Sequence, residues 1–124
     1  MKKGTYVDGF VLTIPKKKAG AYRRMAAEAA KVWKRFGALD YKECVIDDAK
    51  PTFVTFTFGK MAKVKPSEQV WFSYIVYKSR AHRDAVNKKV MAHFDKKYKD
   101  KKDMPMPFDM KRMAYAGFKV VVSG

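Results

Sequence analysis

The stretch EQVWFSYIVYK, from Glu68 to Lys78, is the most apolar segment of this 124-residue chain and is typical of a β-strand. Successive side chains of a strand point to opposite faces of its sheet. Here both alternations are apolar, with Val70, Phe72, Tyr74 and Val76 on one side and Trp71, Ile75 and Tyr77 on the other. The stretch therefore predicts a strand that is covered on both faces.

The segments around this strand repeat one pattern. We expect a strand, a helix and a strand before it, at Thr5–Pro15, Lys16–Phe36 and Ala38–Ile46, and a helix, a loop and a strand after it, at Ser79–Tyr98, Lys99–Asp109 and Lys111–Val122. The stretch Thr52–Pro66 is ambiguous between a short extra strand and a turn of helix or a loop. Right-handed crossovers place both helices on one face of the sheet. The order predicts an α+β fold, a ferredoxin-like βαββαβ sandwich with an antiparallel sheet, as one domain over residues 1–124.

The face of the sheet without helices would expose a large apolar surface, and a second copy of the chain is the simplest cover for it. We therefore predict a homodimer that packs through the sheet face, a dimeric α+β barrel. Side-chain size suggests which face is which. The small or aliphatic set should lie under the helices, namely Val7, Gly9, Val11, Ala114, Ala116, Phe118 and Val120. The opposite set should face the barrel interior, namely Tyr6, Asp8, Phe10, Glu43, Tyr115 and Lys119.

The formal net charge of +16 raises the question of a polyanionic partner. Only six of the 28 basic residues are arginines, and the lysine clusters at 16–18 and 96–102 fall where helix ends and loops are expected. The predicted third strand also lacks the glycine of an RNA-recognition motif. These features favour a solvated basic surface over a nucleic-acid site. No apolar run approaches the length of a membrane span, and the lone Cys44 indicates a cytoplasmic protein without an internal disulfide.

His82 opens the second predicted helix, for which Ser79 is a plausible N-cap. At steps of four residues His82 lies in line with Val86, Val90 and Phe94, which predicts a place on the apolar face of the helix. Two interpretations stay open for His82: a hydrogen-bonded structural role, and a role in ligand binding or proton transfer. The neighbouring polar residues should face solvent, namely Arg80, Arg83, Asn87 and Lys89, and Asp84 should pair with Lys88.

Asp8 lies in the middle of an apolar strand, where a carboxylate needs either a partner or a wet cavity. Lys119 and Tyr115, on the predicted last strand, are the nearest candidates for a partner. Alternatively, Asp8, Tyr115 and Tyr74 converge on a site at the side of the barrel. Two histidines and one cysteine, dispersed along the chain, predict no metal site, and no motif predicts a cofactor.

Four segments together resemble the YbaA-like bacterial proteins: YVDGFVLTIP at 6–15, VWFSYIVYKSRAHRDAVN at 70–87, MPFD at 106–109 and KRMAYAGFKV at 111–120. These are short proteins without an assigned function. The resemblance implies the dimeric α+β barrel superfamily, which also includes cofactor-free monooxygenases and stress-response proteins. It brings no established catalytic residues with it. The lysine-rich KKYKDKK segment and the aromatic TFVTFTFGKMA segment depart from the usual pattern.

The sequence names no reaction and leaves open whether the protein is an enzyme. Our hypothesis is a small-ligand binding or cofactor-free enzymatic role in a barrel-side cavity of a homodimer. The candidate ligand-binding residues are Asp8, Tyr74, His82, Tyr115 and Lys119. The alternative is a non-catalytic binding module whose basic surface contacts a polyanion such as RNA.

Overall fold

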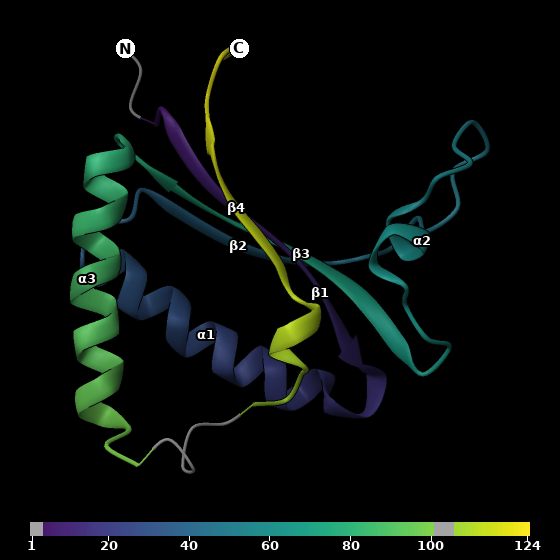
Figure 1. Cartoon of the computed structure of the whole chain (residues 1–124), viewed down its shortest axis with the longest axis horizontal. Helices are drawn as coiled ribbons and strands as arrows, with labels where there is room; N and C mark the ends of the chain where they lie inside the picture. The colour runs from purple at the N-terminus through teal and green to yellow at the C-terminus, as the bar shows by residue number, and fades with distance from the viewer. Residues whose placement is uncertain (1–3, 101–105) are drawn as a thin grey trace.

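A four-stranded antiparallel sheet forms the centre of the computed structural model, which describes residues 4–100 and 106–124 (Figure 1). Its strands are β1 (Tyr6–Pro15), β2 (Asp40–Val45), β3 (Glu68–Tyr77) and β4 (Ala114–Lys119), in the order β2-β3-β1-β4. The helices are α1 (Ala19–Arg35), α2 (Phe58–Ala62) and α3 (Arg80–Lys97), with short 3₁₀ turns at Lys16–Lys18 and Met110–Arg112. The protein is thus an α+β protein, as predicted. Within these described ranges, no helix is long and apolar enough to cross a membrane.

The ends of the elements follow from particular residues. Gly37 follows the C-terminal end of α1 with a φ of 117°, a left-handed conformation that glycine adopts without steric cost. The Ser79 side chain accepts a hydrogen bond from the backbone N–H of His82 at 3.1 Å, which confirms Ser79 as the N-cap of α3. Within Thr52–Pro66 the structure forms α2, capped by Thr57, and no strand. Of the alternatives that the sequence left open, the structure therefore has a short helix between loop residues.

The two faces of the sheet are the reverse of the prediction from side-chain size. The inner face, which α1 and α3 cover, carries Tyr6, Asp8, Phe10, Leu12 and Ile14 of β1. The outer face carries the alternate set, with Val7, Gly9 and Val11 of β1 beside Phe72, Tyr74 and Val76 of β3 and Phe118 of β4. Small residues do not serve to bring a helix close here. A Cβ on Gly9 would lie 3.1 Å from the Phe118 ring, so Gly9 makes room for an aromatic neighbour on its own face.

The hydrophobic core on the inner face is divided into two clusters. One contains Leu12, Ile14, Tyr22, Ala26 and Trp71, beside the N-terminal half of α1. The other contains Val32, Ala38, Ile75, Tyr77, Val86 and Val90, where the C-terminal end of α1 meets α3. Phe10 packs against both clusters. Figure 1 shows the reason for the division: α1 and α3 are close at one end and diverge toward the other.

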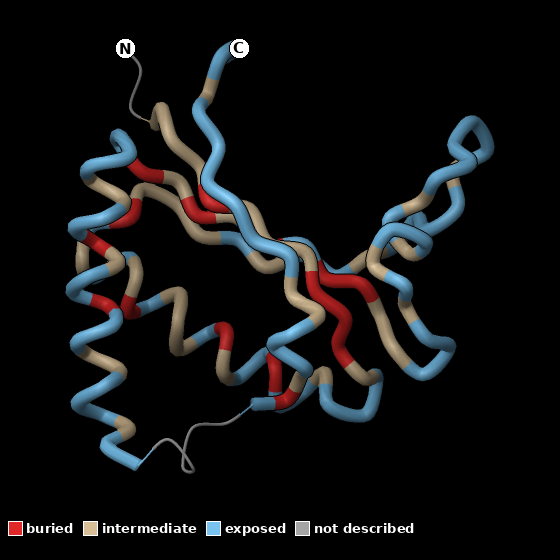
Figure 2. The backbone as a smooth tube through the Cα atoms, viewed as in Figure 1, coloured by how far each residue is buried: buried red, intermediate tan, exposed pale blue. Residues whose placement is uncertain are grey.

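The outer face keeps several large apolar side chains in contact with solvent. Phe118 is 57% exposed, and Phe72 is also exposed. The connection from β2 to α2, residues 46–57, extends away from the sheet as an arm (Figure 1), and its Phe53 and Phe56 are 88% and 69% exposed. Figure 2 shows the arm and β4 as largely exposed, while most buried residues lie on β1, β3, α1 and α3.

Candidate functional site

A cavity of ≈ 480 Å³ lies between the inner face of the sheet and helices α1 and α3. We call it the helix–sheet cavity. Its walls include Leu12 and Tyr22 from one core cluster and Ile75 from the other. Voids in packed cores are seldom larger than a water molecule, whereas ligand sites typically enclose about 300–1,000 Å³. The helix–sheet cavity has the size of a ligand site and is too large to be a packing defect.

Most of the cavity wall is aromatic or contains methionine. Its aromatic residues are Phe10, Tyr22, Trp33, Tyr41, Phe94, Tyr98, Phe108 and Tyr115. Five methionines also line the cavity, namely Met25, Met91, Met106, Met110 and Met113. Met91, Met106 and Met110 are exposed, so they border the side that is open to solvent. Because methionine is flexible and polarisable, such a wall can adapt to ligands of more than one shape.

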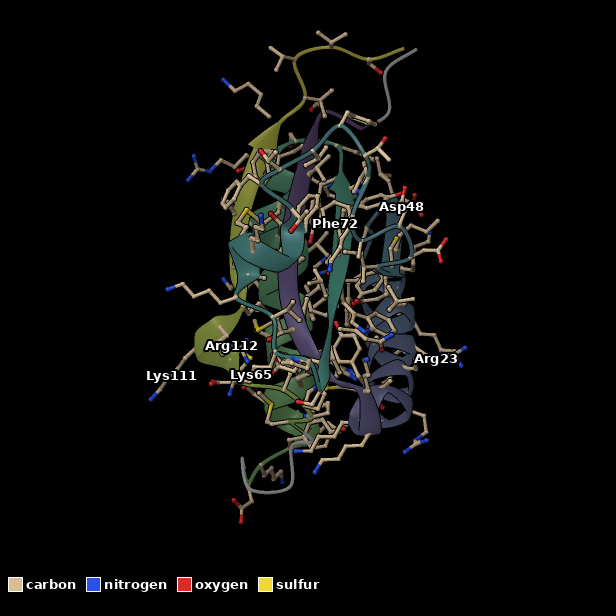
Figure 3. The ribbon with its side chains drawn as sticks, turned by 90° about the vertical axis from the view of Figure 1, so that its right-hand side faces the viewer. Arg23, Asp48, Lys65, Phe72, Lys111 and Arg112 are labelled. Carbon is tan, nitrogen blue, oxygen red and sulfur yellow. The ribbon has the colours of Figure 1, made fainter. Side chains whose placement is uncertain are left out.

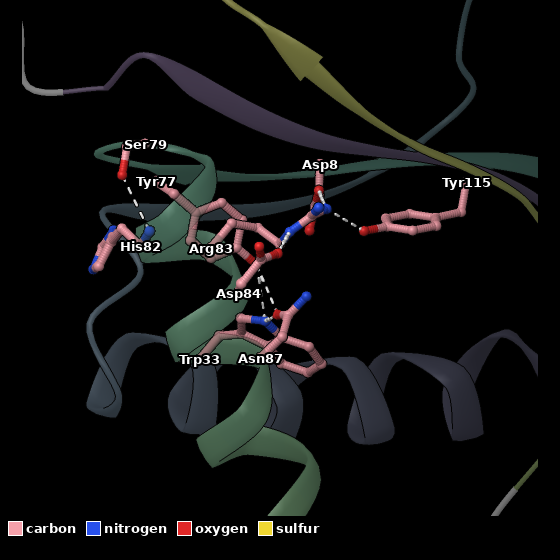
Figure 4. Close-up of polar contacts among 9 residues, drawn as sticks. All are labelled: Asp8, Trp33, Tyr77, Ser79, His82, Arg83, Asp84, Asn87 and Tyr115. Atoms are coloured by element: carbon pink, nitrogen blue, oxygen red, sulfur yellow. Dashed lines mark hydrogen bonds and ion pairs between the residues drawn. The ribbon is translucent and has the colours of Figure 1, made fainter.

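Asp8 points under the helices into this cavity region, with only 1% of its surface exposed. Arg83 Nη1 of α3 donates a hydrogen bond to Asp8 Oδ1 at 2.7 Å and another to Tyr115 Oη at 2.6 Å (Figure 4). Arg83 Nε donates to Asp84 Oδ1 at 2.8 Å, and the guanidinium lies 5.1 Å from the centre of the Tyr6 ring. This network joins β1, β4 and α3 and closes one end of the cavity.

The neutral forms of the tyrosines around Asp8 are favoured by their surroundings. Burial raises the pKa of Tyr115, and the negative charge of Asp8 raises it further. The pKa of Tyr77 is raised for the same two reasons, in the same order. Both hydroxyls therefore stay protonated over the physiological pH range, which makes them hydrogen-bonding groups rather than bases.

Glu43 of β2 lies in another part of the cavity wall. Within the described residues, the side-chain hydrogen bonds to its carboxylate come from two tyrosines. Tyr22 Oη donates to Glu43 Oε1 at 2.8 Å, and Tyr41 Oη donates to Glu43 Oε2 at 2.8 Å. Burial raises the pKa of Glu43 above its ordinary value, although the two hydroxyl bonds oppose the shift. Since each carboxylate oxygen has two lone pairs, Glu43 can accept further hydrogen bonds from a ligand.

A third polar group of the wall is held by α1, β3 and α3 together. Trp33 Nε1 donates to Asn87 Oδ1 at 3.0 Å and to Tyr77 Oη at 3.1 Å, while Tyr77 Oη donates to Asn87 Oδ1 at 3.2 Å (Figure 4). These bonds fix the Trp33 ring and the Asn87 amide where the two helices meet. They hold this part of the cavity wall together.

His82 lies outside the residues that line the cavity, on the other side of Arg83 (Figure 4). Its Nδ1 accepts a hydrogen bond from the backbone N–H of Lys78 at 3.0 Å, and its ring packs against Gly37 and Tyr77. Burial lowers the pKa of His82, and the charges of Lys78 and Lys89 lower it further. The structure thus gives His82 a partly buried, hydrogen-bonded position at the start of α3.

The structure brings together two of the five candidate residues. Asp8 and Tyr115 meet through Arg83. Tyr74 lies on the outer face, opposite Gly9, so it cannot share a site with Asp8. Lys119 lies opposite Tyr6 at the end of β4, two residues beyond the position opposite Asp8, and the predicted pairing of Asp8 with Lys119 is wrong.

The sequence interpretation missed Arg83 and Asn87, which it placed toward solvent. The side chain of Arg83 is only 13% exposed, and Asp84 pairs with Arg83 rather than with Lys88. A signal was present. A carboxylate in mid-strand needs a buried cation, and arginine is the residue best suited to a buried pair. Arg83 and Asn87 are four residues apart, on one side of the helix that crosses the strand of Asp8.

Among the described residues, no lysine, arginine or histidine lines the cavity, although Arg83 bonds to Asp8 and Tyr115 in its wall. Arg24, Lys31, Arg35, His93 and Lys97 border a shallow depression between the outer sides of α1 and α3, where Lys97 pairs with Glu28. Figure 3 shows Arg23 and Lys111 projecting into solvent from opposite sides of the molecule. A positive charge spread in this way suits a solvated surface better than one nucleic-acid groove.

Residues 5–110 match the family described as Protein of unknown function (DUF1428). The chain belongs to this family. It is 45% identical over 117 residues to the Uncharacterized protein YbaA of Escherichia coli (strain K12), a match that covers 94% of this chain and 97% of that protein. The same figures hold for the Uncharacterized protein YbaA of Shigella flexneri. The resemblance to YbaA-like proteins is therefore confirmed, and the family's function is unknown.

Among solved structures, a de novo designed protein, Foldit4, is similar over 92% of this chain and 96% of its own, with a TM-score of 0.45 and 10% sequence identity. For this DUF1428 protein the functional argument therefore depends on its own residues. The cavity, the Asp8–Arg83 network and the Glu43 carboxylate with its tyrosines are the features of the described residues that could bind or orient a ligand.

Proposed function

We propose that this protein binds a small, largely apolar molecule in the helix–sheet cavity. One observation carries the proposal: a cavity of ≈ 480 Å³ is bordered by both core clusters, and aromatic and methionine side chains line most of it. A few fixed polar groups, Glu43, Asn87 and Asp8, converge on the same space and could orient the ligand. This site replaces the barrel-side site that the sequence suggested.

A binding role fits the chemistry of these polar groups. Asp8 is held by Arg83, and the nearby tyrosine hydroxyls have raised pKa values. A general base needs a proton-accepting group that is free to reach the ligand. Glu43 is the carboxylate best placed for such contact, and both of its oxygens are oriented by tyrosines. The same geometry would position a ligand whether or not a reaction follows.

We infer, further, that the chain is a ferredoxin-like sandwich that forms a homodimer through the outer face, as a dimeric α+β barrel. The order β2-β3-β1-β4, with α1 and α3 following the two central strands, supports the ferredoxin-like assignment. The exposed Phe72 and Phe118 of the outer face, and Phe53 and Phe56 of the arm, support a protein partner there. A cytoplasmic location is supported by Cys44, an exposed free thiol.

The cavity can be tested with a neutral aromatic probe, naphthylethanol, followed by isothermal titration calorimetry. Ala29→Phe places a ring inside the cavity, because Ala29 lines it. We expect the wild type to bind the probe and Ala29→Phe to lose about tenfold or more in affinity. Ala21→Phe adds the same ring on the exposed side of α1 and serves as the control. Equal affinity of all three proteins would contradict binding in the cavity.

A further inference from the structure

We propose that the ligand of the helix–sheet cavity is an organic cation, an apolar or aromatic body that carries a protonated amine, with Glu43 as its counterion. This inference rests on the proposed binding function and names the chemical class that the cavity would take. The argument comes from the charges on the cavity wall, from the partners of each carboxylate and from the aromatic rings around Glu43.

The charges on the cavity wall have the opposite sign to those of the chain as a whole. The sequence contains 28 lysines and arginines against 12 aspartates and glutamates. Among the described residues that line the cavity, however, four are carboxylates, Asp8, Glu28, Glu43 and Asp95, and none is lysine, arginine or histidine. Clefts lined by charges of one sign favour ligands of the opposite sign, so this lining favours a cation over an anion.

Glu43 differs from the other three carboxylates in its partners. Asp8 is paired with Arg83, Glu28 is paired with Lys97, and Asp95 is exposed to solvent. For Glu43 the described structure shows two tyrosine hydroxyls and no cation. A half-buried carboxylate is stabilised most by a positive charge. A ligand ammonium would supply that charge and use the lone pairs that the tyrosines leave open.

The rings around Glu43 would favour the same ligand. Tyr22 and Tyr41, which orient the carboxylate, themselves line the cavity, and Trp33 lies 5.9 Å from Tyr41 between ring centroids. Phe94 lies 6.3 Å from Trp33 on the side of α3. The faces of aromatic rings attract cations, most strongly where water is displaced. The cavity thus combines a carboxylate, flat aromatic surfaces and flexible methionines, which suit the charge and the body of an aromatic amine.

The decisive experiment compares three probes with one naphthalene body: naphthylethylamine, which is cationic, naphthylethanol, which is neutral, and naphthylacetate, which is anionic. Calorimetry on the wild type near neutral pH should rank them in that order, with the amine at least about tenfold tighter than the alcohol. Glu43→Gln keeps the size of the side chain and one acceptor oxygen but removes its charge. In that variant the advantage of the amine over the alcohol should fall to about twofold or less.

Asp48→Asn is the matched control, since it removes one exposed carboxylate from the arm, outside the cavity. It should keep the wild-type preference for the amine. Equal binding of the amine and the alcohol by the wild type would overturn the cation inference and leave cavity binding intact. A preference for naphthylacetate, or an amine preference that persists in Glu43→Gln, would also overturn it. Failure of all three probes to bind the wild type would count against both proposals.

Discussion

The inner and outer faces of the sheet differ in how their side chains are satisfied. On the inner face Asp8 is bonded by Arg83 and Glu43 by two tyrosines, around the helix–sheet cavity. On the outer face Phe72 and Phe118 are exposed and apolar. Polar groups fixed in a cavity can orient a small molecule, whereas a flat apolar surface suits another protein. We therefore propose a different kind of partner for each face.

The largest expected effect concerns the ion pair that anchors the inner face. Arg83→Met would leave Asp8 buried without a cation, and breaking a buried pair in this way costs about 3–5 kcal/mol of unfolding free energy. Urea unfolding measures the change. Arg80→Met, on the exposed side of the same helix, is the control and should change stability by less than about 0.5 kcal/mol. Similar stabilities for the two variants would show that Asp8 does not depend on Arg83.

The outer face can be disrupted by one charge. Phe118→Glu places a carboxylate at the proposed dimer interface in each subunit, and an unpaired charge there costs several kcal/mol. We expect sedimentation equilibrium to show a dimer for the wild type. For the variant, the dissociation constant of the dimer should be about a hundredfold higher. Ala21→Glu, on the exposed side of α1, should remain dimeric. A wild type that is monomeric at micromolar concentration would contradict the proposal that the outer face is a dimer interface.

Removing the His82 side chain should lower the unfolding free energy by less than the loss of Arg83 does. His82→Ala removes the bond to the Lys78 N–H and the packing against Tyr77, so we expect a loss of about 1–3 kcal/mol near neutral pH. Because burial depresses the pKa of His82, its contribution is present above the ordinary histidine pKa and is lost as pH falls through the depressed value. The gap between the wild type and the variant should therefore narrow in acid.

Two further results decide between a structural and a ligand role for His82. Naphthylethanol affinity should be the same in the wild type and in His82→Ala, since His82 does not line the cavity. Lys88→Ala, exposed on the same helix, controls for a general effect on α3. An unchanged melting temperature together with lost binding would assign His82 to the ligand instead.

The smallest effect expected is a gain of stability. The folded-state pKa of Glu43 is raised, chiefly by burial, so its ionisation opposes folding as pH rises through that value. Glu43→Gln has no such ionisation. As the pH rises from mildly acidic to neutral, the stability of the variant relative to the wild type should therefore increase. Thermal unfolding at several pH values measures this difference. A variant that loses relative stability over this range would show that the ionised carboxylate supports the fold.

Much of the fold followed from the sequence because the signals were local. The alternation in Glu68–Tyr77, the N-cap at Ser79 and the glycine after α1 each depend on neighbouring residues, and the elements lie within a few residues of the predicted ranges. The loop predicted at Lys99–Asp109 includes residues 101–105, which lie outside the described structure. The assignment of the two faces failed because it depended on the distance between helix and sheet, which no local pattern encodes.

The site was predicted only in part for a similar reason. Asp8 was identified because a carboxylate in mid-strand is unusual by itself. Its partner Arg83 lies 75 residues away in sequence, and only the crossing of α3 over β1 brings the two together. Identifying Glu43 required three separate facts: the place of its side chain on the inner face of the edge strand β2, the tyrosines from α1 and β2, and the divergence of the helices that leaves space beside it.

A crystal structure of the protein with naphthylethylamine is the most direct test of the claim that the inner face binds a small organic cation. The claim predicts the naphthalene ring between the sheet and helices α1 and α3. It also predicts the amine nitrogen about 2.7–2.9 Å from a carboxylate oxygen of Glu43. The amine bound on the outer face, or inside the cavity with its nitrogen turned away from Glu43, would contradict it.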